Sequence, residues 1–177
     1  MEASRILTNR CVMDEKTLRR TYARLFRRQL LIFYVGAGLI LAFSLLLIAL
    51  QGGLYPMSVF LGIAAVIYLF IGLRMPKKQA RLQVRRYEET GLTAPEVAVR
   101  FEDEALIGRR EGSEELTHIS YDDVKSLLPD GNRIILWTRQ KQYIVLDTAR
   151  FENGDEADFW KRMNEACPDA VPRKYRG

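Results

Sequence analysis

Apolar residues dominate one long stretch in the first half of the chain. Residues 29–73 are 45 consecutive positions without Asp, Glu, Lys, Arg or His. A transmembrane helix needs about 20 apolar residues, and a charged side chain inside hydrocarbon is costly. The stretch therefore predicts two membrane spans, residues 30–50 and 54–73, joined by the turn Gln51-Gly52-Gly53. Glycine permits the backbone conformations of a tight reversal, so we expect an antiparallel helical hairpin.

A soluble helical hairpin and a signal peptide both fit this stretch less well than two membrane spans. A buried hairpin of a soluble protein would be expected to carry a polar stripe, and neither segment has one. A cleaved signal peptide is not expected, because the run starts late and is too long for the apolar core of such a peptide. The spans contain no carboxylate, Lys or His that could relay protons or bind ions, so a transport pathway is not favoured.

Small residues recur in both predicted spans. The first span contains Gly36, Ala37, Gly38 and Ala42, and the second contains Gly62, Ala64 and Ala65. Small side chains let helices approach closely, so we expect these residues to pack within the hairpin or between copies of the chain.

Basic residues crowd both flanks of the apolar stretch, while the connecting turn carries no charge. Cytoplasmic flanks of membrane spans are enriched in Lys and Arg, so both termini are predicted to be cytoplasmic in a multi-pass protein of the cell membrane. The predicted membrane-flanking basic residues are Arg19, Arg20, Arg24, Arg27, Arg28, Arg74, Lys77, Lys78, Arg81, Arg85 and Arg86.

The net charge of +5 conceals an uneven distribution. Residues 1–28 carry +5, residues 74–96 carry +3, residues 97–167 carry −5 and residues 168–177 carry +2. The basic charge lies beside the predicted spans, where it attracts the lipid bilayer. The only sizeable soluble region is acidic, so nucleic acid is not an expected partner.

The N-terminal segment, residues 1–28, combines a weak strand pattern with a basic helix. Residues 5–13 have strand character, and Asp14 is a good N-cap for a helix over residues 15–28. That helix has apolar side chains on one face and arginines elsewhere, and it leads directly into the first span. The pattern fits an interfacial anchor and a helix that packs on the soluble domain equally well.

A basic helical connector, residues 74–96, follows the second span. Pro76 is expected to begin a new helix over about 77–90, which Gly91 ends. A soluble domain then covers residues 97–167. Alternating apolar positions and a strong hairpin turn at Pro129-Asp130-Gly131-Asn132 predict an antiparallel sheet. The expected strands are residues 97–101, 106–107, 116–121, 124–128, 134–138 and 142–147.

A final helix is predicted over residues 155–167, with Asn153 or Asp155 as its cap and Pro168 as its end. Its apolar residues fall on one face, which should close over the sheet. A basic tail covers residues 168–177, and its part from Val171 to Gly177 is expected to be mobile.

Several short motifs carry a resemblance to a known family. They are Val99-Arg100-Phe101-Glu102-Asp103-Glu104, Ile119-Ser120-Tyr121-Asp122-Asp123-Val124, Ile134-Ile135-Leu136-Trp137, Tyr143-Ile144-Val145-Leu146, Arg150-Phe151 and Phe159-Trp160. With the order of segments, they resemble the YcxB-like family of bacterial membrane proteins. The resemblance implies a C-terminal domain similar to a pleckstrin-homology-like (PH-like) barrel, and it implies no catalytic residue. The family's proline after the last strand is missing at Leu146-Asp147-Thr148.

Candidate chemical groups are few. His118 is the only histidine, and without clustered ligands it is expected to be a surface residue or a sheet residue with satisfied hydrogen bonds. Asp122 and Asp123 are adjacent acids, which suit a turn better than acid–base catalysis. Many PH domains bind inositol phosphates with basic residues at the first hairpin turn. Here that turn is Glu102-Asp103-Glu104, and acidic residues repel phosphate.

Cys11 and Cys167 have no metal-ligand spacing, and a disulfide is not expected in the reducing cytoplasm. Cys167 is predicted to be a small core residue. No phosphate-binding loop, nucleophile motif or zinc motif occurs in the sequence. The sequence therefore predicts no catalytic site, no cofactor and no metal.

The expected fold is a membrane α+β protein: a two-helix transmembrane hairpin and a cytoplasmic antiparallel PH-like domain closed by a C-terminal helix. The leading functional hypothesis is a non-enzymatic anchor for a protein-interaction or self-assembly module, with a protein partner or a homo-oligomer. The alternative is a regulatory or sensory subunit, in which the basic helices respond to anionic lipid or membrane state.

Overall fold

The computed structural model describes residues 6–53, 55–112, 114 and 116–176. They form two compact units. The helical unit extends from Leu18 to Arg85. The α+β unit combines the residues up to Thr17 with those from Arg86 onward. Two long apolar helices, antiparallel sheets and a C-terminal helix confirm the predicted α+β class.

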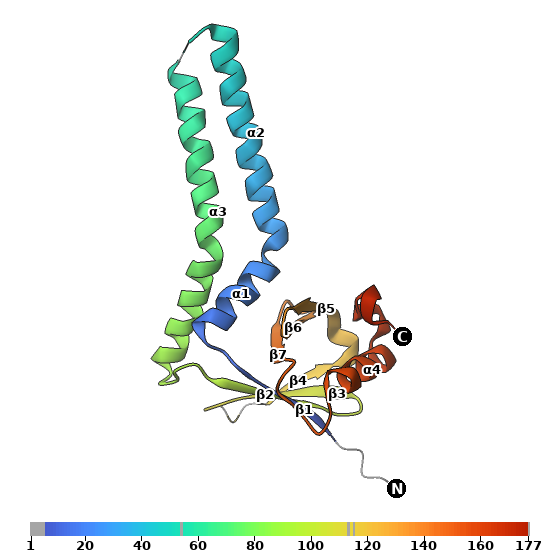
Figure 1. Ribbon diagram of the computed structural model, residues 1–177. Helices are drawn as coiled ribbons and strands as arrows, with labels where there is room; N and C mark the ends of the chain where they lie inside the picture. Colours follow the sequence, from blue (N-terminus) through green and yellow to red (C-terminus); the bar gives the residue numbers. More distant parts are fainter. Residues whose placement is uncertain (1–5, 54, 113, 115, 177) are drawn as a thin grey trace. The chain divides into compact units, whose positions relative to one another are not determined.

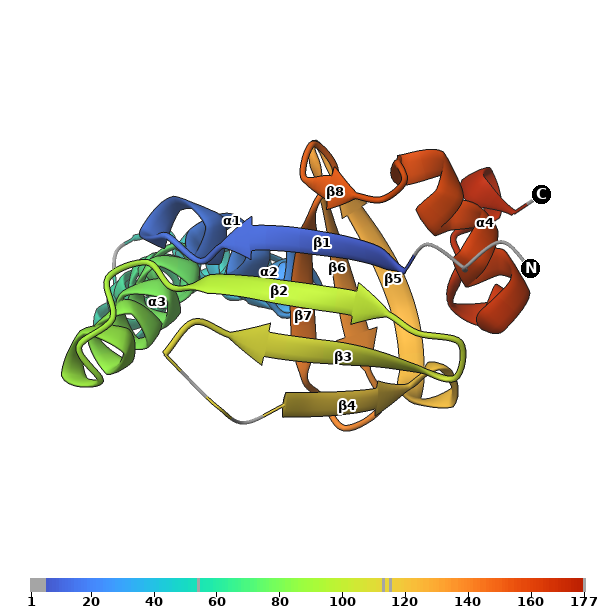
Figure 2. The same ribbon diagram turned by 90° about the horizontal axis from the view of Figure 1, so that it is seen from below.

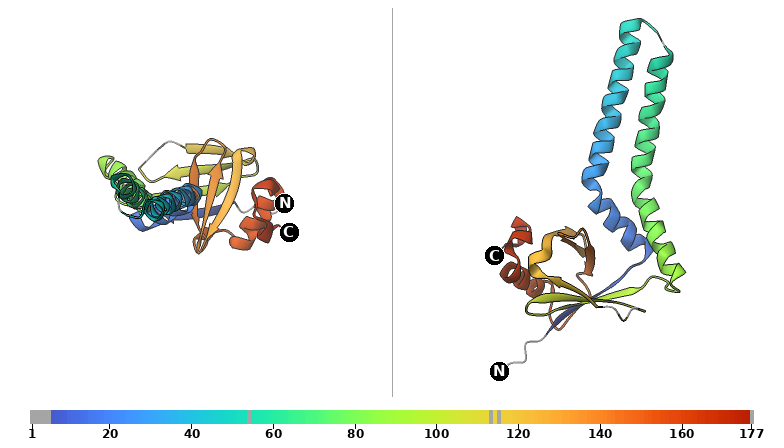
Figure 3. Two further views of the ribbon diagram at one scale, coloured as in Figure 1. Left: turned by 90° about the horizontal axis from the view of Figure 1, so that it is seen from above. Right: turned by 180° about the vertical axis from the view of Figure 1, so that it is seen from behind.

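Two long helices form most of the helical unit, and they run antiparallel, side by side (Figures 1 and 3). They are α2, Arg27–Gln51, and α3, Pro56–Glu89, and they follow the shorter α1, Glu15–Leu25. Gly52 after α2 has a φ of 69°, a left-handed conformation that glycine adopts at low cost. The predicted hairpin and its glycine turn are therefore confirmed.

The basic helix before the hairpin starts as predicted but ends earlier. The backbone N–H of Thr17 donates to Asp14 Oδ1 at 2.7 Å, so Asp14 caps α1. The expected helix over 15–28 is interrupted at Phe26, where φ is −87° and ψ is 5°. Backbone hydrogen bonds continue past this point from Phe26 to Tyr22 and from Leu30 to Phe26. The chain therefore changes direction at Phe26 without losing its hydrogen bonds.

The expectation that Pro76 begins a new helix is wrong. α3 is continuous from Pro56 to Glu89, with Pro76 inside it. A proline removes one backbone hydrogen bond, here to Gly72, and it usually kinks or ends a helix. The Pro76 ring is buried, and long apolar helices tolerate internal proline where neighbouring elements compensate. The predicted connector helix is thus the C-terminal part of α3.

The α+β unit contains two antiparallel sheets whose strands cross steeply (Figure 2). The first sheet has the order β4-β3-β2-β1-β8, and the second has the order β5-β6-β7. The strand bounds are β1 Leu7–Val12, β2 Glu96–Phe101, β3 Ala105–Arg110, β4 Leu116–Ser120, β5 Val124–Asp130, β6 Arg133–Thr138, β7 Tyr143–Asp147 and β8 Phe151–Glu152.

The N-terminal segment supplies the fourth strand of the first sheet. β1 pairs antiparallel with β2 from Leu7 opposite Phe101 to Val12 opposite Glu96, and its other edge pairs with β8. Its buried residues alternate with more exposed ones, as a strand with one covered face requires. The compact unit is therefore wider than the predicted 97–167 domain, because residues before the hairpin complete its sheet.

One apolar core lies between the sheets and the last helix, α4, Glu156–Ala166. Phe101 and Phe159 meet edge to face at a centroid distance of 5.4 Å. The largest fully buried side chains of this core are Phe101, Phe159, Leu106, Leu127, Ile134, Leu136, Leu146 and Met163. Cys167 is also in the core, as predicted.

The β5–β6 turn and the N-terminal cap of α4 are formed by residues that the sequence pattern identifies. Asp130 pairs with Arg133, and Gly131 has a φ of 63°, so the predicted β5–β6 hairpin turn is confirmed. Asp155, rather than Asn153, caps α4. Its Oδ1 accepts from the Asp158 N–H at 2.9 Å, and Asp158 Oδ2 accepts from the Asp155 N–H at 3.1 Å.

The expectation of a mobile tail is wrong. Tyr175 stacks on Trp160 at a centroid distance of 4.1 Å, and Asn164 Nδ2 donates to the Tyr175 carbonyl at 2.7 Å. Val171 is 2% exposed. The tail is basic, but its apolar residues extend the core and give it two short 3₁₀ turns, Pro168–Ala170 and Arg173–Tyr175.

Candidate membrane hairpin and interaction surfaces

The α2–α3 hairpin carries nearly all of the exposed apolar surface. Apart from Leu82 and Leu116, every extensively exposed large apolar side chain among the described residues lies between Leu31 and Leu73. Both helices are long and apolar enough to cross a membrane, yet only 11% of the apolar window of α2 and 17% of that of α3 is buried. A soluble protein rarely leaves so large a continuous apolar surface uncovered.

Specific contacts hold α2 against α3. Ser44 Oγ donates to the Ser58 carbonyl at 2.6 Å, and both serines are buried. Phe33 packs on Tyr68 with ring centroids 4.6 Å apart. This hydrogen bond and this aromatic pair lie at different levels of the hairpin, and together they fix the register of α2 against α3.

Glycine allows the close approach at two levels. A Cβ added to Gly36 would lie 3.3 Å from Tyr68 Cε1, and one added to Gly72 would lie 3.3 Å from Phe33 Cβ. A Cβ added to Gly62 would lie 3.6 Å from Ser44 Oγ, which is an ordinary contact. The sequence correctly predicted that small residues pack within the hairpin. Gly38 is different, because it is exposed and a Cβ there would meet nothing within 4 Å.

Ten of the predicted membrane-flanking basic residues belong to the helical unit, and we call them the basic collar. They are Arg19, Arg20, Arg24, Arg27, Arg28, Arg74, Lys77, Lys78, Arg81 and Arg85. Arg86 belongs to the α+β unit. Because α2 and α3 are antiparallel, all ten lie at the end of the hairpin opposite the Gly52 turn (Figure 1). Arg74 lies over the Phe70 ring, 4.0 Å from its centroid.

The adjacent acids Asp122 and Asp123 lie at a turn. Tyr121–Asp123 forms a 3₁₀ turn, and the Asp122 N–H donates to Ser120 Oγ at 3.3 Å. The predicted turn at these two residues is thus confirmed. His118 is exposed on β4, also as predicted. The described residues contain no group of three His, Cys, Asp or Glu side chains that could hold a metal ion.

A contact that the sequence did not predict joins the β2–β3 turn to α4. Arg162 Nη2 donates to Asp103 Oδ1 at 2.9 Å, and Arg162 Nε donates to the Tyr121 hydroxyl at 3.3 Å. That hydroxyl donates to the Glu102 carbonyl at 2.8 Å. Burial raises the pKa of Tyr121, and the Arg162 guanidinium opposes this shift. No local sequence signal connects residues 59 positions apart.

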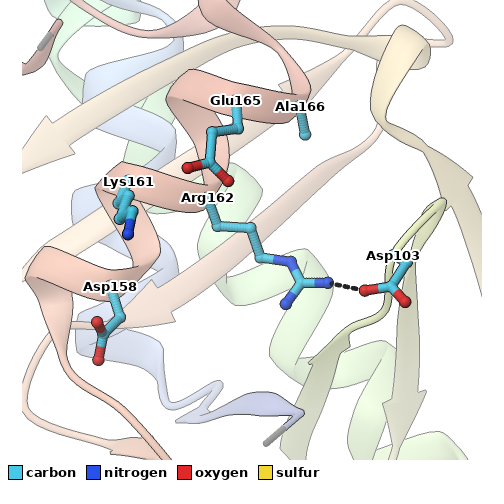
Figure 4. Close-up of a pocket in the computed structure, with 6 residues that line it drawn as sticks. All are labelled: Asp103, Asp158, Lys161, Arg162, Glu165 and Ala166. Carbon is cyan, nitrogen blue, oxygen red and sulfur yellow. Dashed lines mark hydrogen bonds and ion pairs between the residues drawn. The ribbon is translucent and has the colours of Figure 1, made fainter. Parts of the chain in front are cut away.

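Arg162 also lines a surface hollow of about 530 Å³ (Figure 4). The other residues around it are Asp103, Asp158, Lys161, Glu165 and Ala166. Asp158 belongs to the capping box and Arg162 is bonded to Asp103, so these groups already have structural partners. A typical small-molecule site is lined mainly by apolar side chains, which this charged hollow lacks.

The two cysteines have inert thiols. Cys11 and Cys167 are both buried and unpaired. Burial raises the pKa of each thiol to about 11, so the reactive thiolate is rare at neutral pH.

The outer strands of the two sheets differ in how far they are protected against pairing with another chain. β8 has two residues, and β5 carries Lys125 and Pro129. The last residue of β7 bonds to Asn9 of β1. β4, Leu116–Ser120, has five residues without charge or proline, and Leu116 is 49% exposed. β4 is therefore the least protected edge of the α+β unit.

No protein-family model, no curated protein and no solved structure matches this chain.

Proposed function

We propose that the chain is an integral membrane protein. Its α2–α3 hairpin spans the bilayer twice and holds the α+β unit at the cytoplasmic surface. The observation that carries the proposal is the continuous apolar surface of the hairpin between Leu31 and Leu73. Transfer of one large apolar side chain out of water contributes about 1.5–3 kcal/mol, and this surface contains many.

The dimensions of the hairpin support this assignment. The 21 uncharged residues of α2 from Leu30 to Leu50 span about 31 Å at 1.5 Å per residue. The hydrocarbon core of a bilayer is about 30 Å thick. The basic collar lies at one end of the hairpin and the uncharged turn at the other, so the positive-inside rule supports a cytoplasmic location for both termini.

For the α+β unit we propose a non-enzymatic role in binding another protein or a second copy of the chain. An exposed strand edge is a common docking place, because an incoming extended segment satisfies its free backbone groups. β4 supports this role as the edge without charge or proline. From the motifs of the sequence we also propose a YcxB-like, PH-like relationship, and two antiparallel sheets with one closing helix are compatible with it.

Site-specific photo-crosslinking in cells tests the role of β4. A photoreactive residue in place of Leu116 or His118 should capture one recurrent protein, and the same residue in place of Lys125 on β5 should not. Leu116→Lys should abolish the capture while the protein stays folded and membrane-bound. Equal capture from β4 and β5, or capture that survives Leu116→Lys, would contradict docking at β4.

A further inference from the structure

The charge of the helical unit is entirely of one sign. Between Leu18 and Arg85 there are ten Lys and Arg residues and no Asp or Glu. The rest of the chain carries a net charge of −5. The ten cations are gathered at one end of an apolar hairpin, and three of them, Arg24, Arg81 and Arg85, already interact with other groups of the chain.

On α3 the collar residues share one helical face. After Arg74, the other four come 3, 4, 7 and 11 residues later, a spacing that places side chains on the same side of a helix: Lys77, Lys78, Arg81 and Arg85. All five are exposed. Eleven residues of helix rise about 16 Å, so the stripe starts at the last apolar turn and extends away from it.

A second group of cations lies on α1 and at the start of α2. Arg19 and Arg20 are exposed on α1, and Arg27 and Arg28 are exposed at the start of α2. In the described part of the chain, no ion pair involves these four arginines, Lys77 or Lys78. These six exposed cations are therefore available to an anion from outside the chain.

We propose that the basic collar binds the phosphate headgroups of anionic phospholipids and selects them over zwitterionic ones. The inference rests on the proposed insertion of the hairpin, which places the collar at headgroup depth. Each Lys or Arg near an anionic surface adds to the attraction. Orienting the hairpin requires only an excess of positive charge. The collar extends this charge over three helices, along α1, at the start of α2 and along the C-terminal part of α3.

Native mass spectrometry of the full chain in mild detergent tests this selection. The probes are phosphatidylglycerol and phosphatidylcholine with the same acyl chains. We expect the wild-type chain to prefer phosphatidylglycerol at least tenfold. The variant Arg19→Gln/Arg20→Gln/Lys77→Gln/Lys78→Gln should lose most of this preference. A matched control, Lys125→Gln/Arg139→Gln/Lys141→Gln/Arg173→Gln, removes four exposed cations from the α+β unit and should keep it.

The outcomes separate this inference from the proposed insertion. Resistance of each variant to alkaline extraction from membranes reports insertion independently of lipid preference. If the wild-type chain is inserted but binds both lipids equally, the lipid preference is overturned and the proposed insertion is kept. Equal losses in the two quadruple variants would also overturn it, as would displacement of phosphatidylglycerol by millimolar inorganic phosphate, because the site would then take a free anion.

Discussion

The side chain of Asn9 pairs with the backbone of Asp147 as a neighbouring strand would. Asn9 Nδ2 donates to the Asp147 carbonyl at 2.7 Å, and Asn9 Oδ1 accepts from the Asp147 N–H at 3.0 Å. Asn9 is fully buried on β1 of the first sheet, and Asp147 ends β7 of the second. Asn9 precedes the α2–α3 hairpin in the chain and Asp147 follows it, and their contact joins the two sheets.

Asn9→Ala should destabilise the α+β unit by about 1–3 kcal/mol, because the partly buried Asp147 N–H loses its partner and the Asp147 carbonyl keeps only the Arg150 N–H. Guanidinium unfolding of the full chain in micelles, followed by tryptophan fluorescence, measures this. Both tryptophans, Trp137 and Trp160, lie in the α+β unit. Asn132→Ala, at an exposed turn position, is the control and should change stability by less than about 0.5 kcal/mol. Equal effects of the two substitutions would refute the joining role of Asn9.

Two arginines of the α+β unit should respond oppositely to methionine. Arg162→Met removes the bonds to Asp103 and Tyr121, and should cost up to about 1 kcal/mol because Asp103 is 87% exposed. Arg133 buries Nε and Nη1 without a hydrogen-bond partner, and burial of an unpaired polar group is unfavourable. Arg133→Met should therefore leave stability unchanged or raise it. The same fluorescence assay measures the free energy of unfolding of both variants. A larger loss of stability for Arg133→Met than for Arg162→Met would contradict the contacts described.

Asp14 should make the start of α1 sensitive to acid. Partial burial raises the pKa of Asp14, but hydrogen bonds from Thr17 and the nearby Arg133 charge outweigh it and hold the pKa below its ordinary value. The folded state therefore binds this proton less readily than the unfolded state. The stabilisation is present at neutral pH and is lost as pH falls through the lowered pKa of the folded state.

Asp14→Ala should cost about 1 kcal/mol at pH 7, as loss of an N-cap usually does. The difference from wild type should shrink towards pH 2.5, measured by unfolding at both pH values. Asp14→Asn keeps a capping oxygen but cannot titrate, so it should retain most of the stability at pH 7. A constant cost of Asp14→Ala across this range would show that the carboxylate charge is irrelevant.

The hairpin should tolerate a large residue at one glycine and not at two others. Gly36→Ile and Gly72→Ile would push against Tyr68 and Phe33, whereas Gly38→Ile faces open space. A cysteine pair, Ser44→Cys with Gly62→Cys, reports the α2–α3 contact, because the Ser44 hydroxyl lies 3.6 Å from a Cβ at Gly62. Disulfide formation should fall at least fivefold with the first two substitutions and stay unchanged with the third. An equal decrease for Gly38→Ile would show that the register of α2 is different.

Local chemistry made much of this architecture predictable. The uncharged run, Gly52, Gly131 and the Asp14 and Asp155 caps each act within a few residues, so the sequence pattern identifies them. The errors had a different origin. Pro76 stays inside α3 and Tyr175 stays ordered because of packing against other elements, which overrides the local preferences for a helix break and a mobile tail.

Long-range contacts were the least predictable. The Arg162–Asp103 contact joins residues 59 positions apart, and the Asn9–Asp147 contact joins residues 138 positions apart. Neither has a motif, because the first depends on where α4 packs and the second on how the two sheets cross. The weak strand pattern of residues 5–13 indicated β1, but the partner strands became known only from the structure.

Cysteine labelling in intact cells tests the central claim, the double span with both ends in the cytoplasm. Gly53→Cys lies at the turn with open space around its Cβ, and Lys141→Cys lies on the exposed β6–β7 turn. The native thiols, buried and of raised pKa, should react slowly. A membrane-impermeant maleimide should label Gly53→Cys in intact cells and Lys141→Cys only after permeabilisation. Labelling of Lys141→Cys in intact cells, or protection of Gly53→Cys until permeabilisation, would contradict the proposed topology.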